Sequence, residues 1–187
     1  TQEMMAHKHT AVILATGGSD MVRVAHSMGK PAYGVGPGNV PAYVDRSADL
    51  EKAARYIVAS KAFDYSVICA TEQAVVADRP IAARLKQLME SEGAYFVDET
   101  QANALRKTLF YPDGSINVST VGKSPQYLAA MAGIQVPGHA RILVARLNKV
   151  GKEEPLSREK MTTVRGWYEA NGWEAGCDRC IEMINFG

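Results

Sequence analysis

Cys69 is the residue whose type most directly offers chemistry. A cysteine acts as a nucleophile when it is accessible and its thiolate lies near positive potential or free backbone N–H groups. Cys69 follows a predicted helix and lies in a buried-looking turn, in the run ICATEQ that begins at Ile68. A cysteine between Ile68 and Ala70 is also typical of a core position. The motif alone therefore leaves a catalytic and a structural interpretation open.

Cys177 and Cys180 form the second cysteine motif, a Cys-x-x-Cys pair that could bind a metal or exchange electrons. No second Cys or His pair is near enough in sequence to complete a tetrahedral site. The pair lies at helical spacing with Trp173, Ile181 and Ile184, which favours packing in a core. The histidines lack ligand spacing as well, so we expect solvated or capping roles for them and no metal site: His7, His9, His26 and His139.

Two glycine-containing segments follow predicted strands. Thr16, Gly17 and Gly18 end a strand before a helix, where free N–H groups and the positive end of the helix dipole favour a cofactor or its phosphates. The run Gly34-x-Gly36-x-Gly38 also permits close approach of a ligand to the backbone. A tight loop without a ligand explains either segment equally well.

The elements that must position these residues alternate between strand and helix. Short apolar runs predict strands over residues 11–15, 32–35, 43–45, 74–77, 95–97, 141–147 and 163–168. Helical spacing predicts helices after the caps Ser19, Ser47, Thr100 and Ser124, one that opens at Pro80 and one over residues 173–185. This order predicts an α/β fold with a parallel sheet.

The charged residues indicate no strongly charged partner. Residues 149–160 have the composition of a polar linker, and Lys61 and Arg106 are expected to be solvated helix charges. The net charge is +1, with no dense run of Lys or Arg, which disfavours a nucleic-acid partner. No apolar stretch is long enough to cross a bilayer. Three cysteines without disulfide spacing favour a reducing compartment, so we expect a cytoplasmic protein.

Four segments, read in chain order, resemble the coenzyme-A-acylating aldehyde dehydrogenases. They are ILATGG from Ile13, GKP from Gly29, GVGPGN from Gly34 and SVICATEQ from Ser66. The resemblance covers nearly the whole chain. It implies the end of a Rossmann-like NAD(P)-binding domain over residues 1–45, followed by most of the catalytic domain over residues 46–187. Because the chain opens on Thr1, we expect a piece of a longer protein.

The resemblance also implies roles for individual residues. Cys69 is expected to attack an aldehyde, pass hydride to NAD or NADP, and leave a thioester that coenzyme A accepts. Thr16, Gly17 and Gly18 are expected beside the cofactor, together with Val35 and Gly36. Glu154 matches the glutamate that reaches the nicotinamide ribose, although Leu156 replaces the aromatic residue that usually follows.

Departures from related enzymes narrow this expectation. Hydrolytic aldehyde dehydrogenases carry a glutamate near Val35 that activates water, and valine cannot take a proton, so a thiol acceptor is favoured. The asparagine of the oxyanion hole has no counterpart in this chain, which leaves the backbone N–H of Cys69 as a donor. A homo-oligomer is expected for the full-length protein, with a microcompartment or a fused alcohol dehydrogenase domain as further surroundings. The alternatives are a hydrolytic aldehyde dehydrogenase and a non-catalytic scaffold module.

Overall fold

The computed structural model describes residues 1–186 of the chain, which form two compact units, Thr1–Gly38 and Asn39–Gly187. The first unit contains α1 (Gln2–Ala6), β1 (Ile13–Thr16), α2 (Ser19–His26) and β2 (Ala32–Val35). Strands β1 and β2 pair in parallel, with Thr16 opposite Val35. Ile13, Ala15 and Ala25 are buried between this strand pair and α2. The βαβ order predicted from the apolar runs is therefore present.

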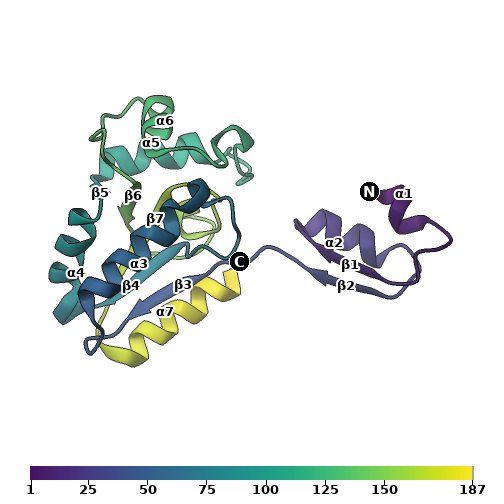
Figure 1. Cartoon of the computed structure of the whole chain (residues 1–187), viewed down its shortest axis with the longest axis horizontal. Coiled ribbons are helices and arrows are strands. Elements are labelled where there is room, and N and C mark those ends of the chain that lie inside the picture. The colour runs from purple at the N-terminus through teal and green to yellow at the C-terminus, as the bar shows by residue number, and fades with distance from the viewer. Residues whose placement is uncertain (187) are drawn as a thin grey trace. The chain divides into compact units, whose positions relative to one another are not determined.

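The second unit is built on a five-stranded parallel sheet of order β3-β4-β7-β6-β5 (Figure 1). Its strands are β3 (Pro41–Val44), β4 (Ala74–Asp78), β5 (Ala94–Val97), β6 (Ile142–Arg146) and β7 (Val164–Ala170). Its helices are α3 (Leu50–Ala62), α4 (Arg79–Ser91), α5 (Glu99–Leu109), α6 (Pro125–Ala132) and α7 (Gly172–Phe186), with short 3-10 turns η1 (Phe63–Ser66), η2 (Val118–Thr120) and η3 (Pro155–Ser157). The predicted α/β class is confirmed.

Helices cover both faces of this sheet, because side chains alternate between the faces along each strand. Val75 and Val144 face α3 and α4, whereas Val76 and Leu143 face the opposite core with α5, α6 and α7. Figure 1 shows α3 and α7 on opposite sides of the β3–β4 edge. Central strands buried on both faces explain why the sequence shows continuous apolar runs there and not an alternating pattern.

The observed units divide at Gly38, whereas the sequence predicts a boundary after Asp45. Strand β3 lies in that interval and pairs with β4, so hydrogen bonding places it in the second sheet. Three predicted caps are wrong, the first being Ser19, which is the first residue of α2 and follows the N-cap Gly18. Asp49 caps α3 in place of Ser47, and Asp98 caps α5 in place of Thr100, because each aspartate accepts a backbone N–H from the first turn.

The second half of residues 149–160 packs into the core, so the segment is not the polar linker that composition suggests. Leu156, Ser157 and Lys160 are fully or almost fully buried, and Glu154 is also buried. The segment crosses from the carboxyl end of β6 to the amino end of β7, so it must pass over the packed structure between the two strands. No helix within residues 1–186 is long and apolar enough to span a bilayer.

Candidate active site

Cys69 lies in an exposed turn that precedes β4 at the amino-terminal edge of the five-stranded sheet. The turn runs from Ile68 to Thr71 and is closed by the Thr71 N–H, which donates to the Ile68 carbonyl at 3.1 Å. The prediction of a buried turn is wrong, because Val67 and Ile68 expose their side chains too. An exposed thiol removes the core interpretation of Cys69 and meets the first requirement for a nucleophile.

The backbone entering this turn is strained. Asp64, Tyr65 and Ser66 have φ values of 46°, 48° and 65°, although none of them is glycine. Left-handed backbone costs an L-residue roughly 1–2 kcal/mol. The Ser66 and Thr71 hydroxyls lie 2.6 Å apart and form a hydrogen bond across the turn. Strain at successive residues persists only where surrounding contacts hold it, so the conformation of the Cys69 turn depends on its supports.

One support is the ion pair between Glu72 and the buried Arg165. The Arg165 Nη2 donates to the Glu72 carboxylate at 2.8 Å and to the Glu72 carbonyl at 3.0 Å. The Ser60 hydroxyl donates to the same carboxylate at 2.9 Å. Burial raises the pKa of Glu72, whereas the Arg165 charge and these hydrogen bonds lower it, and the net shift is downward. The residue three positions after Cys69 is thus fixed to β7 and α3.

Two buried lysines adjoin the same segment. Lys61 Nζ donates to Gln73 Oε1 at 3.0 Å, and Lys160 Nζ donates to the carbonyls of Leu156 and Arg158 at 2.7 and 2.6 Å. The expectation of a solvated Lys61 is wrong, because the side chain is 0% exposed. Burial, followed by repulsion from Lys160 and Arg165, lowers the pKa of Lys61 well below its ordinary value.

Burial also lowers the pKa of Lys160 to about 7 and the pKa of Arg165 to about 10. Arg165 Nε and Nη1 and Thr162 Oγ1 are buried without a hydrogen-bond partner among the described residues. The segment after Cys69 therefore packs against buried basic side chains, of which only Arg165 has a carboxylate hydrogen bond.

Five of the six residues predicted beside a cofactor lie together in the first unit, at the carboxyl ends of β1 and β2. Thr16 ends β1 opposite Val35, and the Gly17 N–H donates to the Val35 carbonyl at 3.1 Å. Gly18 is the N-cap of α2, whose first N–H groups lack partners within the helix. A Cβ added at Gly18 or Gly36 would meet nothing within 4 Å. Free donors and open backbone fit an anionic or carboxamide group of a dinucleotide.

Glu154 does not project a free carboxylate. Arg106 Nε donates to its two oxygens at 2.9 and 3.1 Å, and Nη2 donates to Oε2 at 2.6 Å. The expectation that Arg106 is solvated is wrong, because its side chain is 16% exposed and bonded to Glu154 and Glu99. The hydrogen bonds from Arg106 to Glu154 raise the pKa of Arg106. A ribose contact at Glu154, as the resemblance implies, would have to share these oxygens with the guanidinium.

The cysteines of α7 are only partly buried. Cys180 packs at the edge of the core, and burial raises its pKa. The predicted core stripe is wrong elsewhere, because Trp173, Ile181 and Ile184 are exposed. Helix α7 instead buries Gly176 and Met183 towards the sheet. Within residues 1–186, no group of three His, Cys, Asp or Glu side chains is arranged to hold a metal ion.

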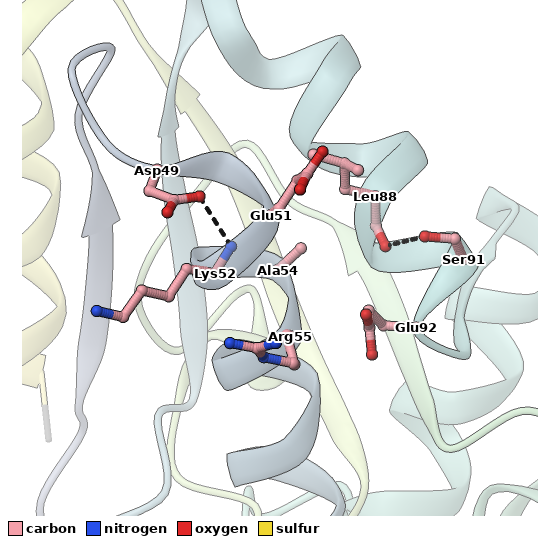
Figure 2. Close-up of a pocket in the computed structure, with 8 residues that line it drawn as sticks. All are labelled: Asp49, Glu51, Lys52, Ala54, Arg55, Leu88, Ser91 and Glu92. Atoms are coloured by element: carbon pink, nitrogen blue, oxygen red, sulfur yellow. Dashed lines mark hydrogen bonds between the residues drawn. The ribbon is translucent and has the colours of Figure 1, made fainter.

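A groove at the opposite end of α3 contains none of the predicted site residues. Figure 2 shows it between the first turns of α3 and the last turn of α4, with Asp49, Lys52 and Ser91 on its walls. Asp49 accepts the Lys52 N–H, and Ser91 donates to the Leu88 carbonyl, so these polar groups serve the helix ends. We therefore place the candidate active site at the Cys69 turn and not at this groove.

The sequence gives no signal for Gln73, Lys160 and Arg165, which support the Cys69 turn. Lys160 and Arg165 are distant from Cys69 in the chain, and the adjacency of β4 and β7 brings them to it. Lys160 lies at the end of the predicted polar linker, where a charged residue resembles a solvated one in any local pattern. Only the strand order reveals its burial.

Known proteins resemble this chain over nearly all of its length. The aldehyde-alcohol dehydrogenase of Clostridium acetobutylicum is 41% identical over 176 residues, which are 94% of this chain and 20% of that protein. An acetylating aldehyde dehydrogenase from Geobacillus thermoglucosidasius has a solved structure that superposes with a TM-score of 0.96 at 44% identity, over 100% of this chain and 41% of that one.

A third similar protein is known in an acylated form. It is a propionaldehyde dehydrogenase from Rhodopseudomonas palustris, solved with bound coenzyme A and an acylated cysteine. Its TM-score is 0.88 at 30% identity, over 97% of this chain and 41% of that one. No protein-family model matches the chain. This chain thus spans about a fifth to two fifths of the length of these three proteins.

The α/β fold and the exposed cysteine turn of this chain are consistent with its 30–44% identity to these proteins. Over the part of their length that it spans, the chain is similar to acetylating and coenzyme-A-bound aldehyde dehydrogenases.

Proposed function

We propose that this chain supplies the nucleophile of an enzyme that converts an aldehyde, coenzyme A and NAD(P)+ into an acyl-coenzyme A and NAD(P)H. The observation that carries the proposal is Cys69 itself, an exposed thiol in a fixed turn within a chain similar to an enzyme solved with an acylated cysteine. The Cys69 sulfur bonds to the aldehyde carbonyl carbon. Loss of hydride from that carbon leaves a thioester, and attack by the coenzyme A sulfur then breaks the bond to Cys69.

The backbone around Cys69 provides the electrostatic part of the proposal. The Cys69 N–H has no hydrogen-bond acceptor among the described residues, so it is free to donate to the oxyanion that forms on the attacked carbon. This donor favours negative charge on that oxygen during attack.

Residues of the first unit are proposed to hold the cofactor. Thr16, Gly17 and Gly18 would lie beside it where β1 leads into α2, whose first N–H groups are free to donate, with Val35 and Gly36 on the neighbouring strand end. When bound, NAD(P)+ accepts the hydride. Glu154 is proposed to reach the ribose only if it shares its oxygens with Arg106.

Coenzyme A, and not water, is proposed as the acyl acceptor. Val35 offers no general base for water at the position where hydrolytic relatives carry glutamate. A product analysis separates the two outcomes. We expect acyl-coenzyme A to dominate over free acid, and a predominance of free acid would contradict the assignment.

The direct test exploits the reverse acyl transfer, which needs no cofactor. The chain is incubated with propionyl-coenzyme A, and the mass of each cysteine peptide is followed with time. We expect a propionyl group on Cys69 with release of free coenzyme A, no label on Cys177 or Cys180, and no label in Cys69→Ser. Equal labelling of the three cysteines would exclude a dedicated nucleophile.

We further propose that the full-length protein is a homo-oligomer in the cytoplasm or in a bacterial microcompartment. A fused alcohol dehydrogenase domain is the alternative to the microcompartment, since the Clostridium acetobutylicum relative is named as an aldehyde-alcohol dehydrogenase. Light scattering of the full-length protein tests the oligomer, and a monomeric mass would refute it.

A further inference from the structure

The side chain of Gln73 connects the Cys69 turn to two buried lysines. Gln73 is 1% exposed, and both ends of its amide are used. Its Oε1 accepts from Lys61 Nζ at 3.0 Å and from the Lys160 backbone N–H at 3.2 Å. Its Nε2 donates to the Thr71 carbonyl at 3.0 Å. One amide thus joins the end of α3, the segment before β7 and the Cys69 turn.

The orientation of this amide is fixed by its partners. An ammonium group and a backbone N–H are both donors, so they select the oxygen of Gln73 and leave its nitrogen for the Thr71 carbonyl. The Gln73 backbone is held as well, because its N–H donates to the Val40 carbonyl at 2.7 Å and its carbonyl accepts from Gly166 at 2.9 Å. Gln73 is therefore held rigidly, and its Nε2 fixes the position of the Thr71 carbonyl.

Thr71 transmits this position to Cys69. Its N–H closes the Ile68–Thr71 turn at 3.1 Å, and its hydroxyl bonds the left-handed Ser66 at 2.6 Å. Cys69 is the second residue of that turn. A shift of the Thr71 peptide would move the Cys69 sulfur and the Cys69 N–H together, and both must face the same carbonyl group.

We propose that Gln73 is a positioning residue for the Cys69 thiol, acting through the Thr71 carbonyl, with Lys61 and the Lys160 backbone fixing the direction of its amide. This inference deepens the proposed function and rests on it. Gln73 does not touch the reacting atoms. It holds the turn in the conformation from which sulfur attacks and the N–H stabilises the oxyanion.

Gln73→Glu separates positioning from stability. The carboxylate keeps an acceptor for Lys61 and for the Lys160 backbone N–H. It replaces the Nε2 donor by an oxygen that faces the Thr71 carbonyl, so the contact that aims the turn becomes repulsive. The repulsion also weakens folding, so acylation rates are compared at equal folded fraction. We expect the maximal rate of Cys69 acylation by propionyl-coenzyme A to fall about tenfold or more.

Gln126→Glu is the matched control, because it makes the same chemical change elsewhere in the second unit. Gln126 Nε2 donates to the Gly138 and Ala140 carbonyls at 3.1 and 2.8 Å, far from the Cys69 turn in the chain. We expect acylation of Cys69 at the wild-type rate in this variant. The concentration of propionyl-coenzyme A that gives half the maximal rate should be the same in all three proteins, since positioning acts on the chemical step.

A maximal rate in Gln73→Glu equal to that of the wild type would overturn the proposal. A rate that falls only in proportion to a lost folded fraction would overturn it too. If wild-type Cys69 takes no propionyl group, the proposed function fails, and iodoacetamide then decides the positioning role separately. A changed alkylation rate at Cys69, with Cys177 and Cys180 unaffected, would support it, and equal rates would end it.

Discussion

Lys160 makes the stability of the second unit depend on pH in an unusual direction. Burial lowers its pKa from 10.5 to about 7, with Arg165 as the second cause and Glu154 and Glu159 acting in the opposite sense. The unfolded chain binds a proton at Lys160 up to about pH 10.5, whereas the folded chain releases it near pH 7. Between these values the unfolded state carries more protons, so the free energy of unfolding must rise with pH.

The size of the effect follows from the same two values. The slope approaches about 1.4 kcal/mol per pH unit once Lys160 is neutral in the folded state. Integrated from pH 6 to pH 9, the contribution of Lys160 amounts to about 2–3 kcal/mol of added stability at the higher pH. In Lys160→Met this pH-dependent contribution is absent. The variant also loses the hydrogen bonds to the Leu156 and Arg158 carbonyls, which lowers its stability at every pH.

Urea unfolding at several pH values measures the difference. Both tryptophans, Trp167 and Trp173, lie in the second unit, so their fluorescence reports on that unit alone. Lys149→Met is the control, because Lys149 is exposed and paired with the exposed Glu153. We expect the control to keep the wild-type rise and Lys160→Met to lose about 2–3 kcal/mol of it. The same rise in Lys160→Met as in the wild type would refute the reasoning.

Two further substitutions test the supports of the site by urea unfolding. Tyr65→Gly removes left-handed strain at φ 48° and should stabilise the chain by about 0.5–1 kcal/mol after the entropy cost of glycine. The same change at Tyr56, which lies in a helix, should destabilise the chain. A loss of stability at both positions would contradict the idea that Tyr65 is strained. Arg106→Met leaves the buried Glu154 without its guanidinium partner and should lower the free energy of unfolding by about 3–5 kcal/mol. Arg84→Met, at an exposed position of α4, should change it little. Equal effects would show that the Arg106–Glu154 pair does not stabilise the fold.

Local patterns were sufficient where a few consecutive residues decide the structure. Strand β2 occupies the predicted residues 32–35, and α6 begins after Ser124, whose side chain caps it. Helix α6 ends at Gly133 with a φ of 66°, as a glycine after a helix predicts. Caps, turns and short apolar runs act within one or two turns of chain, so their signals survive in the sequence alone.

Local patterns failed where competing caps or distant packing decide the outcome. Ser47 and Asp49 both suit a helix start, and only the backbone path shows that Asp49 accepts the first-turn N–H. The stripe of Trp173, Ile181 and Ile184 has helical spacing, yet α7 turns Gly176 and Met183 to the sheet. Apolar spacing defines a helix face but does not say which face has a partner.

The sequence by itself determined the α/β class and drew attention to Cys69, because strand and helix signals and a residue's chemical type are local properties. Only the tertiary structure decided that Cys69 is exposed while Lys61, Lys160 and Arg165 are buried around the residues that follow it. Gln73 bonds to partners 12 and 87 positions away in the chain. Such contacts depend on the β4–β7 pairing, and no short window of sequence contains both sides of that pair.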